Sequence, residues 1–296
     1  MSSGESESRA SVLSEALPYI RDFHGEKVVI KYGGSVMQND ELKKRVAKDI
    51  VLLQYIGLKP LVVHGGGPEI GGTLERIGID SEFVDGLRVT DEETMDVVEM
   101  VLAGRVNKDI VNEINQAGGR AIGLSGKDGQ MLLADPHSSQ QELDVDLGQV
   151  GEIRSVNAEP LDLLEEKNYI PVIAPIGVNE EGVTYNMNAD QVSGALASAL
   201  GARKLIFLTD VVGIMIDGKL KSTLTLDEVE PLIQDGTIQG GMIPKVRACL
   251  EAVRSGVEKA HIIDGTRHHS LLLELLTQEG IGTQIIPDPD EVSASE

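Results

Sequence analysis

The chain has 296 residues, of which 41% are hydrophobic and 25% are charged, enough apolar sequence for one large α/β domain or two fused lobes. Its formal net charge of -22 argues against nucleic-acid binding, because such proteins need a basic face. No segment approaches the ~18 consecutive apolar residues of a membrane span. The single cysteine excludes a disulfide within the chain and is typical of a reducing cytoplasm.

The acidity leaves two interpretations open, because an acidic cytoplasmic enzyme and a protein adapted to high salt both carry strongly negative surfaces. In either case an anionic substrate is repelled at long range, so its site must be built from local donors. The cysteine itself, Cys249, lies in an apolar helical pattern between Val246 and Val253. This pattern indicates a buried structural thiol and not a nucleophile.

The N-terminal segment, residues 1–26, is predicted to be a disordered start followed by a helix. Apolar residues over Ser11–Phe23 follow helical spacing, and Pro18 inside that pattern predicts a kink. Since this helix precedes the first predicted strand, it is expected to be an appendage to the core.

After this helix, strand and helix patterns alternate. Strands are predicted at Lys27–Lys31, Leu61–His64, Arg120–Leu124, Ile170–Ile176, Leu205–Leu208 and Thr283–Ile286. Helices are predicted at Asp40–Ile56, from a capping box at Thr90–Glu93 to Gly118, at Asp190–Leu200 and at Pro244–Ser255. Gln130–Ile153 has short runs and turn residues that favour antiparallel hairpins. The alternation predicts an α/β fold whose mainly parallel sheet is covered on both faces.

Parallel α/β sheets bind ligands at the carboxyl ends of their strands, and three segments there have suggestive residues. In Lys31–Ser35 a lysine closes a strand before two glycines, and in His64–Pro68 three glycines follow a strand. Glycine allows backbone N–H groups to approach a phosphate closely. A tight turn and a flexible loop are the plain structural alternatives. Asn186–Asp190 leads into a helix, where Asp190 is also a good N-cap.

Several other motifs are absent or weak. The glycine segment after His64 does not fit G-x-G-x-x-G, and no Walker A, H-R-D or D-F-G signature occurs. The pair His268 and His269 lacks spaced metal-ligand partners, so an exposed helix-cap pair is expected and no protein metal site is predicted.

Six segments in order resemble the amino acid kinase family: Lys31–Gly34, His64–Pro68, Gly86–Thr90, Asn186–Gln191, Thr209–Gly213 and Gly241–Lys245. Each motif is modest alone, but their order is specific, and residues 27–286 are similar to the family core. The resemblance implies an open αβα sandwich with a mainly parallel sheet of about eight strands. An N-lobe (27–188) would hold the acceptor and a C-lobe (189–296) the nucleotide.

Within that family the motifs are most similar to members that phosphorylate the γ-carboxylate of N-acetyl-L-glutamate in arginine biosynthesis. The resemblance assigns acceptor binding to Gly66, Gly67, Arg88 and Asn186, and catalysis to Lys31, Lys245 and Asp190, with Asp190 orienting both lysines. It assigns ATP binding to Gly33, Gly34, Asp210, Val211, Val212, Gly213, Ile214, Met215, Thr237, Ile238 and Gln239.

The expected chemistry agrees with these residue types. A carboxylate acceptor with a pKa of about 4.3 is ionised at pH 7, so no general base is required. The difficulty is bringing it to a polyanionic phosphate, which lysines, glycine amides and Mg²⁺ offset. Mg²⁺ is expected to be held mainly by ATP phosphates and water. Arg88 suits bidentate binding of a substrate carboxylate.

The two ends of the chain are similar to an arginine-inhibited, hexameric subgroup. There, kinked N-terminal helices join dimers into a trimer of dimers, and L-arginine binds between that helix and the C-terminal segment. The resemblance therefore implies inhibition by L-arginine near Glu279 and Gly282. Packing of the helix on its own subunit is the alternative. The sequence does not indicate whether a PII-type signalling protein docks.

Three rival functions also fit parts of the sequence. Other family members act on glutamate, aspartate or carbamate, and Gly86–Thr90 and Asn186–Asp190 favour acetylglutamate over them. A catalytically inactive ligand sensor on the same fold is disfavoured because Lys31, Asp190 and Lys245 are all present. A dinucleotide-binding oxidoreductase is disfavoured by the failed glycine fingerprint.

Overall fold

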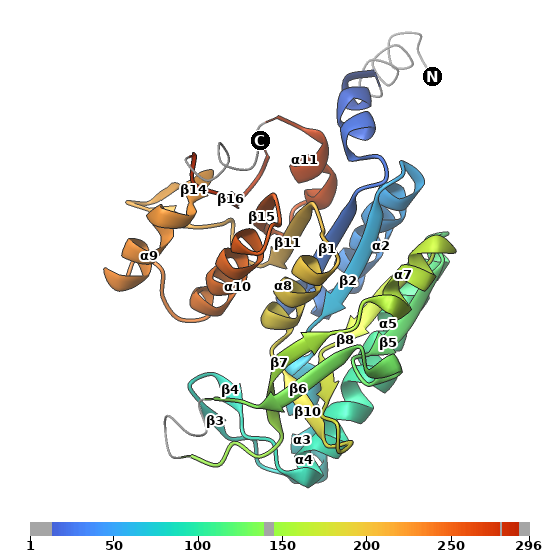
Figure 1. Ribbon diagram of the computed structural model, residues 1–296, viewed down its shortest axis with the longest axis vertical. Coiled ribbons are helices and arrows are strands. Elements are labelled where there is room, and N and C mark those ends of the chain that lie inside the picture. The colour runs from blue at the N-terminus through green and yellow to red at the C-terminus, as the bar shows by residue number, and fades with distance from the viewer. Residues whose placement is uncertain (1–13, 139–144, 279, 290–296) are drawn as a thin grey trace.

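The computed structural model describes residues 14–138, 145–278 and 280–289. At its centre lies an eight-stranded sheet in the order β14-β16-β15-β11-β1-β2-β8-β5 (Figure 1). Only β15 and β16 pair antiparallel in it, which confirms the predicted α/β fold with a mainly parallel sheet. The strands are β1 (Lys27–Tyr32), β2 (Lys59–His64), β5 (Ala121–Ser125), β8 (Ile170–Ala174), β11 (Lys204–Thr209), β14 (Thr223–Thr225), β15 (Lys259–Asp264) and β16 (Thr283–Ile286).

Helices cover both faces of the sheet and create two hydrophobic cores. They are α2 (Asp40–Tyr55), α3 (Gly67–Ile77), α4 (Glu92–Glu99), α5 (Asn107–Gln116), α7 (Glu159–Glu166), α8 (Ala189–Ala199), α9 (Leu226–Gln234), α10 (Met242–Arg254) and α11 (Ser270–Leu276). One core joins residues of α2, α4, α5 and α11, and the other joins residues of α7, α8, α9 and α10.

The central strand β1 contributes to both cores because successive side chains of a strand point to opposite faces. Val28, Ile30 and Tyr32 lie in the core with α2 and α5, whereas Val29 lies in the core with α8 and α10. Lys31 has the same parity as Val29. The alternation of β1 therefore directs the Lys31 side chain toward α8.

The predicted long helix between Thr90 and Gly118 is one helical rod in three parts. A π-helical segment, Met100–Val106, separates α4 from α5. The predicted capping box is wrong, because Asp91 is the N-cap and its carboxylate accepts from the Thr94 N–H at 2.8 Å. Thr90 is held elsewhere, since its backbone pairs with Leu147 and Gln149 and its hydroxyl donates to the Arg88 carbonyl at 2.7 Å.

A closed barrel was only partly predicted. Its strands are β6 (Leu132–Pro136), β7 (Val150–Val156), β9 (Ile176–Val178) and β10 (Thr184–Met187). The antiparallel pairing of β6 with β7 confirms the hairpin expectation for Gln130–Ile153. The single strand predicted at Ile170–Ile176 is divided at Pro175: β8 joins the sheet and β9 joins the barrel. The barrel lies in the half of the molecule that faces away from the N-terminal helix (Figure 1).

Residues 14–23 form the N-terminal helix, which continues through Pro18 and places Phe23 in the core. Residues 1–13 and 290–296 lie outside the described residues, and the predicted disordered start falls there. Cys249 is fully buried, as predicted, and burial raises its thiol pKa. In the described part of the chain, no helix combines the length and apolar character needed to cross a membrane.

Candidate active site

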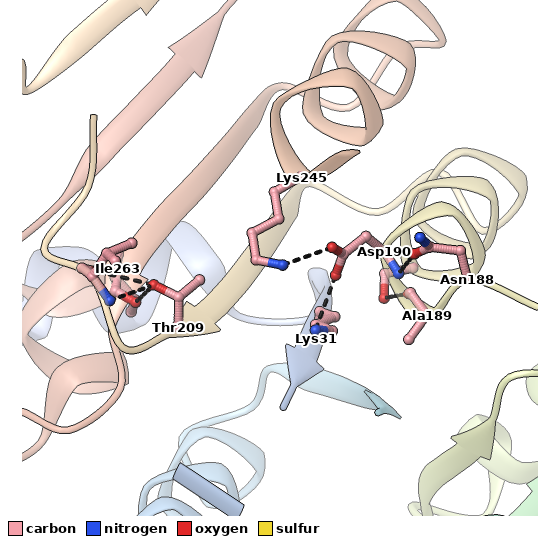
Figure 2. Close-up of polar contacts among 9 residues, drawn as sticks. Lys31, Asn188, Ala189, Asp190, Thr209, Lys245 and Ile263 are labelled. Carbon is pink, nitrogen blue, oxygen red and sulfur yellow. Dashed lines mark hydrogen bonds and ion pairs between the residues drawn. The ribbon is translucent and has the colours of Figure 1, made fainter. Parts of the chain in front are cut away.

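Three predicted residues from distant parts of the chain form a Lys–Asp–Lys cluster (Figure 2). Lys31 comes from the end of β1, Asp190 from the first turn of α8 and Lys245 from the first turn of α10. Lys31 Nζ lies 3.0 Å from Asp190 Oδ1, and Lys245 Nζ donates to Asp190 Oδ2 at 2.8 Å. The Asp190 side chain is 7% exposed, so the cluster is shielded from bulk water.

The electrostatics of this cluster favour an anion. Burial would raise the pKa of Asp190, but the Lys31 and Lys245 ammonium groups outweigh burial and hold that pKa below its usual value. The carboxylate is therefore ionised, and two ammonium groups around it leave an excess of one positive charge. In a chain with a net charge of -22, this local excess supplies the attraction that the protein as a whole does not.

Two glycine segments lie beside the cluster because β1 and β2 are parallel neighbours. Tyr32 pairs with His64 in register, so the residues after both strands meet at the same edge of the sheet. A Cβ at Gly33 would lie 2.8 Å from Lys31 Nζ and 3.9 Å from the Gly65 nitrogen. A side chain at Gly33 would therefore push the Lys31 ammonium away from this position, and glycine leaves room for it. Gly34 follows with a φ of 67° and begins a short 3₁₀ helix.

The four residues predicted to bind the acceptor all line one pocket of about 200 Å³: Gly66, Gly67, Arg88 and Asn186. Asn188 and Ala189, the two residues before Asp190, line it as well. The pocket, called here the acceptor pocket, therefore adjoins the Lys–Asp–Lys cluster.

Arg88 is the charged residue of the acceptor pocket. It lies on β4 (Leu87–Arg88), which forms a hairpin with β3 (Phe83–Val84). Its guanidinium donates to the Gly67 carbonyl and to the Ser81 hydroxyl, and it stacks over the Phe83 ring. Arg88 is 8% exposed and pairs with no carboxylate of the described residues. A buried cation without a counterion is costly, so the arrangement suits an anionic ligand.

A second pocket of about 400 Å³ contains most of the predicted nucleotide-binding residues. Its lining is Val211, Val212, Gly213, Ile214, Met215, Thr237, Ile238, Gln239 and Met242. Of the predicted set, Asp210 is exposed and lies just before this lining, and Gly33 and Gly34 lie beside the cluster instead. Met242 lies three residues before Lys245 on α10, which is slightly less than one helical turn, so the pocket also adjoins the cluster.

Comparison with known proteins identifies the relatives of this chain. The family model "Amino acid kinase family" matches residues 26–264. The chain belongs to the amino acid kinase family. Acetylglutamate kinase from Nitrosococcus oceani is 53% identical over 286 residues, covering 93% of this chain and 95% of the relative. Acetylglutamate kinase from Nitrosospira multiformis is 55% identical over 287 residues, covering 95% and 97%.

Solved structures agree with this family. The N-acetylglutamate synthase of Neisseria gonorrhoeae, complexed with coenzyme A and N-acetyl-glutamate, has a TM-score of 0.82 at 27% identity; the match covers 94% of this chain and 63% of the synthase. A complex of synthase from the same organism with coenzyme A and L-arginine has a TM-score of 0.79 at 26% identity, covering 94% and 65%. Carbamate kinase from Giardia lamblia, with a TM-score of 0.68 at 19% identity and coverage of 89% and 99%, shows the shared fold alone.

A third pocket of this protein has a volume of about 380 Å³. It lies between the N-terminal helix and the C-terminal residues 274–284. Gly282, predicted to be near a regulatory site, lines it, whereas Glu279 lies outside the described residues. Sequence reasoning missed its buried pair, in which His261 Nδ1 lies 2.6 Å from Glu274 Oε1. The two residues come from β15 and α11, and no short motif links them.

Both His268 and His269 are exposed, as expected, but only His269 takes the predicted helix-cap position, and its side chain makes no cap hydrogen bond. His269 is the N-cap residue of α11, and its Nδ1 lies 2.8 Å from the buried carboxylate of Asp49 on α2. Among the described residues, no group of three or more His, Cys, Asp or Glu side chains is arranged to hold a metal ion.

His64, at the end of β2, is buried, and its burial should make the stability of the protein depend on pH. Burial lowers the pKa of His64 from 6.5 to about 4. Below pH 6.5 the unfolded chain takes up a proton that the folded protein does not accept until about pH 4. This difference lowers the free energy of unfolding, by up to about 3 kcal/mol at 1.36 kcal/mol per unit.

We therefore expect denaturant unfolding at pH 5 and pH 7 to show a smaller loss of stability at low pH in His64→Asn than in the unaltered protein. The exposed His268→Asn variant is the control and should keep the full loss. Equal losses in all three proteins would contradict a neutral, buried His64.

Proposed function

We propose that this enzyme transfers the γ-phosphoryl group of ATP to the γ-carboxylate of N-acetyl-L-glutamate. This is the reaction of acetylglutamate kinases in arginine biosynthesis. The observation that carries the proposal is the position of the Lys–Asp–Lys cluster. On one side it adjoins the acceptor pocket, where the buried Arg88 pairs with no carboxylate of the described residues, and on the other side it adjoins a pocket lined by the predicted nucleotide residues. The identity of 53% to an acetylglutamate kinase supports this acceptor.

The two pockets suggest how the substrates are divided. The residues that line the acceptor pocket all fall between Gly65 and Ala189 in the chain. Those that line the nucleotide pocket fall between Val211 and Met242. This division supports an acceptor-binding N-lobe over 27–188 and a nucleotide-binding C-lobe over 189–296. In this arrangement Arg88 binds a carboxylate of N-acetyl-L-glutamate, and Asn186, Gly66 and Gly67 contact its polar groups.

Catalysis then depends on charge compensation and positioning. The acceptor carboxylate is already ionised at pH 7 and needs no base. Lys31 approaches the transferring phosphoryl group from the N-lobe side and Lys245 from the C-lobe side, while Asp190 holds both ammonium groups in place. Fixed cations in a shielded site stabilise a transition state whose negative charge is spread over the phosphoryl oxygens.

Mg²⁺ fits this site as a companion of ATP. The Asp190 carboxylate is committed to two lysines, so it is a poor ligand for a divalent cation. We expect the ATP phosphates and water to hold the ion, which would supply further charge neutralisation.

The proposal is tested by ADP release from ATP and Mg²⁺ with N-acetyl-L-glutamate, L-glutamate, L-aspartate and carbamate compared side by side. Turnover with N-acetyl-L-glutamate alone is the expected result. Turnover with another acceptor would show that the enzyme is an amino acid kinase with a different substrate. Absence of turnover with all four, at low and high salt, would favour a ligand-sensing protein.

L-Arginine is the proposed inhibitor, and the pocket at the N-terminal helix supports it. The pocket is lined by the Glu274 carboxylate and by Lys204, whose pKa is lowered to about 8 by burial. An anion and a cation in one pocket suit the guanidinium and the α-carboxylate of arginine. Arg203 links the pocket to the N-terminal helix, because it donates to Asp22 at 2.9 Å and to Glu258 at 2.8 Å.

The same helix is the proposed contact that joins dimers of this chain into a trimer of dimers. The helix lies at one end of the molecule, and its Leu17 is 53% exposed (Figure 1). An exposed apolar residue on a terminal helix suits packing against the helix of a second copy.

Deleting residues 1–25 is expected to abolish inhibition by L-arginine and to leave dimers, because the deletion removes one wall of the pocket and the proposed contact. ADP release with and without L-arginine and light scattering of the intact and truncated proteins measure both effects. Glu274→Gln in the full chain is the matched variant and should weaken inhibition without changing the oligomer. A truncated protein that L-arginine still inhibits would refute the assignment.

A further inference from the structure

We infer that His64 is a positioning residue that locks the peptide between Gly65 and Gly66, so that the Gly66 N–H faces the phosphoryl transfer. This inference rests on the proposed function and adds a residue to it. His64 does not line the acceptor pocket; it is fully buried behind the glycine segment at the end of β2.

The hydrogen bonds of His64 determine its tautomer. Its Nδ1 lies 2.7 Å from the Gly65 carbonyl oxygen, which can only accept, so Nδ1 carries the proton. Its Nε2 lies 3.2 Å from Asn107 Nδ2, which can only donate, so Nε2 is unprotonated. Both bonds require the neutral Nδ1–H form of the ring.

Asn107 in turn is fixed by its surroundings. Its Nδ2 donates to the Val172 carbonyl at 2.8 Å, and its Oδ1 accepts from Lys108 Nζ at 2.9 Å. These partners admit one orientation of the amide. Asn107 is the first residue after the π-helical segment, and such segments change which face of a helix the following residues present. Asn107 thus ties α5, β8 and His64 into one rigid support.

The support acts on Gly66 through the geometry of the peptide bond. In a trans peptide the carbonyl of one residue and the N–H of the next point in opposite directions. With the Gly65 carbonyl held by His64, the Gly66 N–H must point to the side away from the ring, where Gly65, Gly66 and Gly67 bound the acceptor pocket. The Gly65 N–H is already used, since it donates to the Tyr32 carbonyl at 2.9 Å.

Gly66 N–H is therefore the available donor of this peptide pair. Among the described residues it has no acceptor, and it lies at the N-cap of α3, where the helix dipole favours negative charge. A donor held in advance toward the phosphoryl oxygens stabilises developing charge without reorganisation. Freed from His64, the glycine peptide could rotate and turn this N–H away.

Two substitutions at one position separate this role from packing. An asparagine at position 64 places its amide nitrogen near that of Nδ1 and keeps the donor to Gly65, whereas glutamine places its amide near Nε2 and loses it. We expect His64→Gln to lower kcat for N-acetyl-L-glutamate by about 10²-fold. His64→Asn should stay within about 5-fold of the unaltered enzyme, and KM for MgATP should change by less than about 2-fold in both.

Thermal unfolding and AMP-PNP binding of both variants, with exposed His268→Gln as control, report any loss of structure. If kcat falls equally in His64→Asn and His64→Gln, or follows the melting temperature, the role is packing and the inference is overturned. An unchanged kcat in His64→Gln overturns it as well. Absence of activity in the unaltered protein would instead remove the proposed function, and this role with it.

Discussion

Replacing Lys245 or Lys31 with alanine is expected to lower kcat by about 10²–10³-fold, as loss of one fixed transition-state donor does in other enzymes. Each ammonium neutralises charge that develops on the phosphoryl group, and each is held within 3.0 Å of an Asp190 oxygen. Steady-state ADP release at saturating ATP and N-acetyl-L-glutamate measures the effect.

The two variants should differ in stability. Lys31 has a side chain that is 11% exposed, against 23% for Lys245, so its loss leaves Asp190 without its more deeply buried partner. Lys31→Ala is therefore expected to unfold at a lower temperature than Lys245→Ala. Lys44→Ala, on the exposed face of α2, is the matched control and should leave both kcat and melting temperature unchanged. A Lys31 or Lys245 variant that folds and keeps near-normal kcat would contradict the catalytic role of that lysine.

Replacing Arg88 with leucine should lower kcat/KM for N-acetyl-L-glutamate by about 10²–10³-fold, because a substrate carboxylate would lose a buried, charge-assisted partner. The conservative Arg88→Lys should recover only part of this loss, since lysine cannot form the bidentate fork. KM for MgATP should be unaffected, as Arg88 lines the acceptor pocket and not the nucleotide pocket.

The control for Arg88 is Arg76→Lys on the exposed face of α3, which should change no kinetic constant. Removing Arg88 also relieves the cost of a buried cation without a carboxylate. The free protein should therefore keep its melting temperature in Arg88→Leu, while stabilisation by added N-acetyl-L-glutamate is lost. Equal stabilisation of both proteins by that ligand would show that Arg88 does not bind it.

The proposed arginine site and the acceptor pocket lie in separate parts of the fold. The pocket at the N-terminal helix lies beside β15 and α11, whereas the acceptor pocket lies beside α3 and the barrel. Any coupling between the two pockets would pass through the central sheet and α11. Helix α11 packs in the same core as β1 and α2. Variants in one pocket are therefore expected to leave the other pocket's ligand binding intact, and the truncation and Arg88 experiments test this separation together.

Local sequence patterns determined the elements and the glycine turns of this protein. The periodicity of Asp40–Ile56 and the apolar run at Leu205–Leu208 appear in the structure as α2 and β11, because both depend on near neighbours in the chain. Their alternation was enough to predict a mainly parallel sheet. The six ordered motifs indicated the family, and residues 66, 67, 88 and 186 do line one pocket.

Tertiary structure decided what local patterns could not. Thr90 has the sequence of a cap, yet pairing with Leu147 and Gln149 left that role to Asp91. Pro175 separates two strands into two different sheets, which a continuous apolar run does not reveal.

The contacts that hold the residues of the active site in place also depend on the tertiary fold. The sequence indicated Lys31, Asp190 and Lys245 as the catalytic candidates through the resemblance of their motifs to the amino acid kinase family. The fold brings Asp190 within 3.0 Å of both lysines, as the resemblance implied, whereas only the fold showed that Asn107 holds His64 from 43 residues away. Contacts between residues so far apart in the chain depend on how helices and strands pack, and no local pattern of residues encodes them.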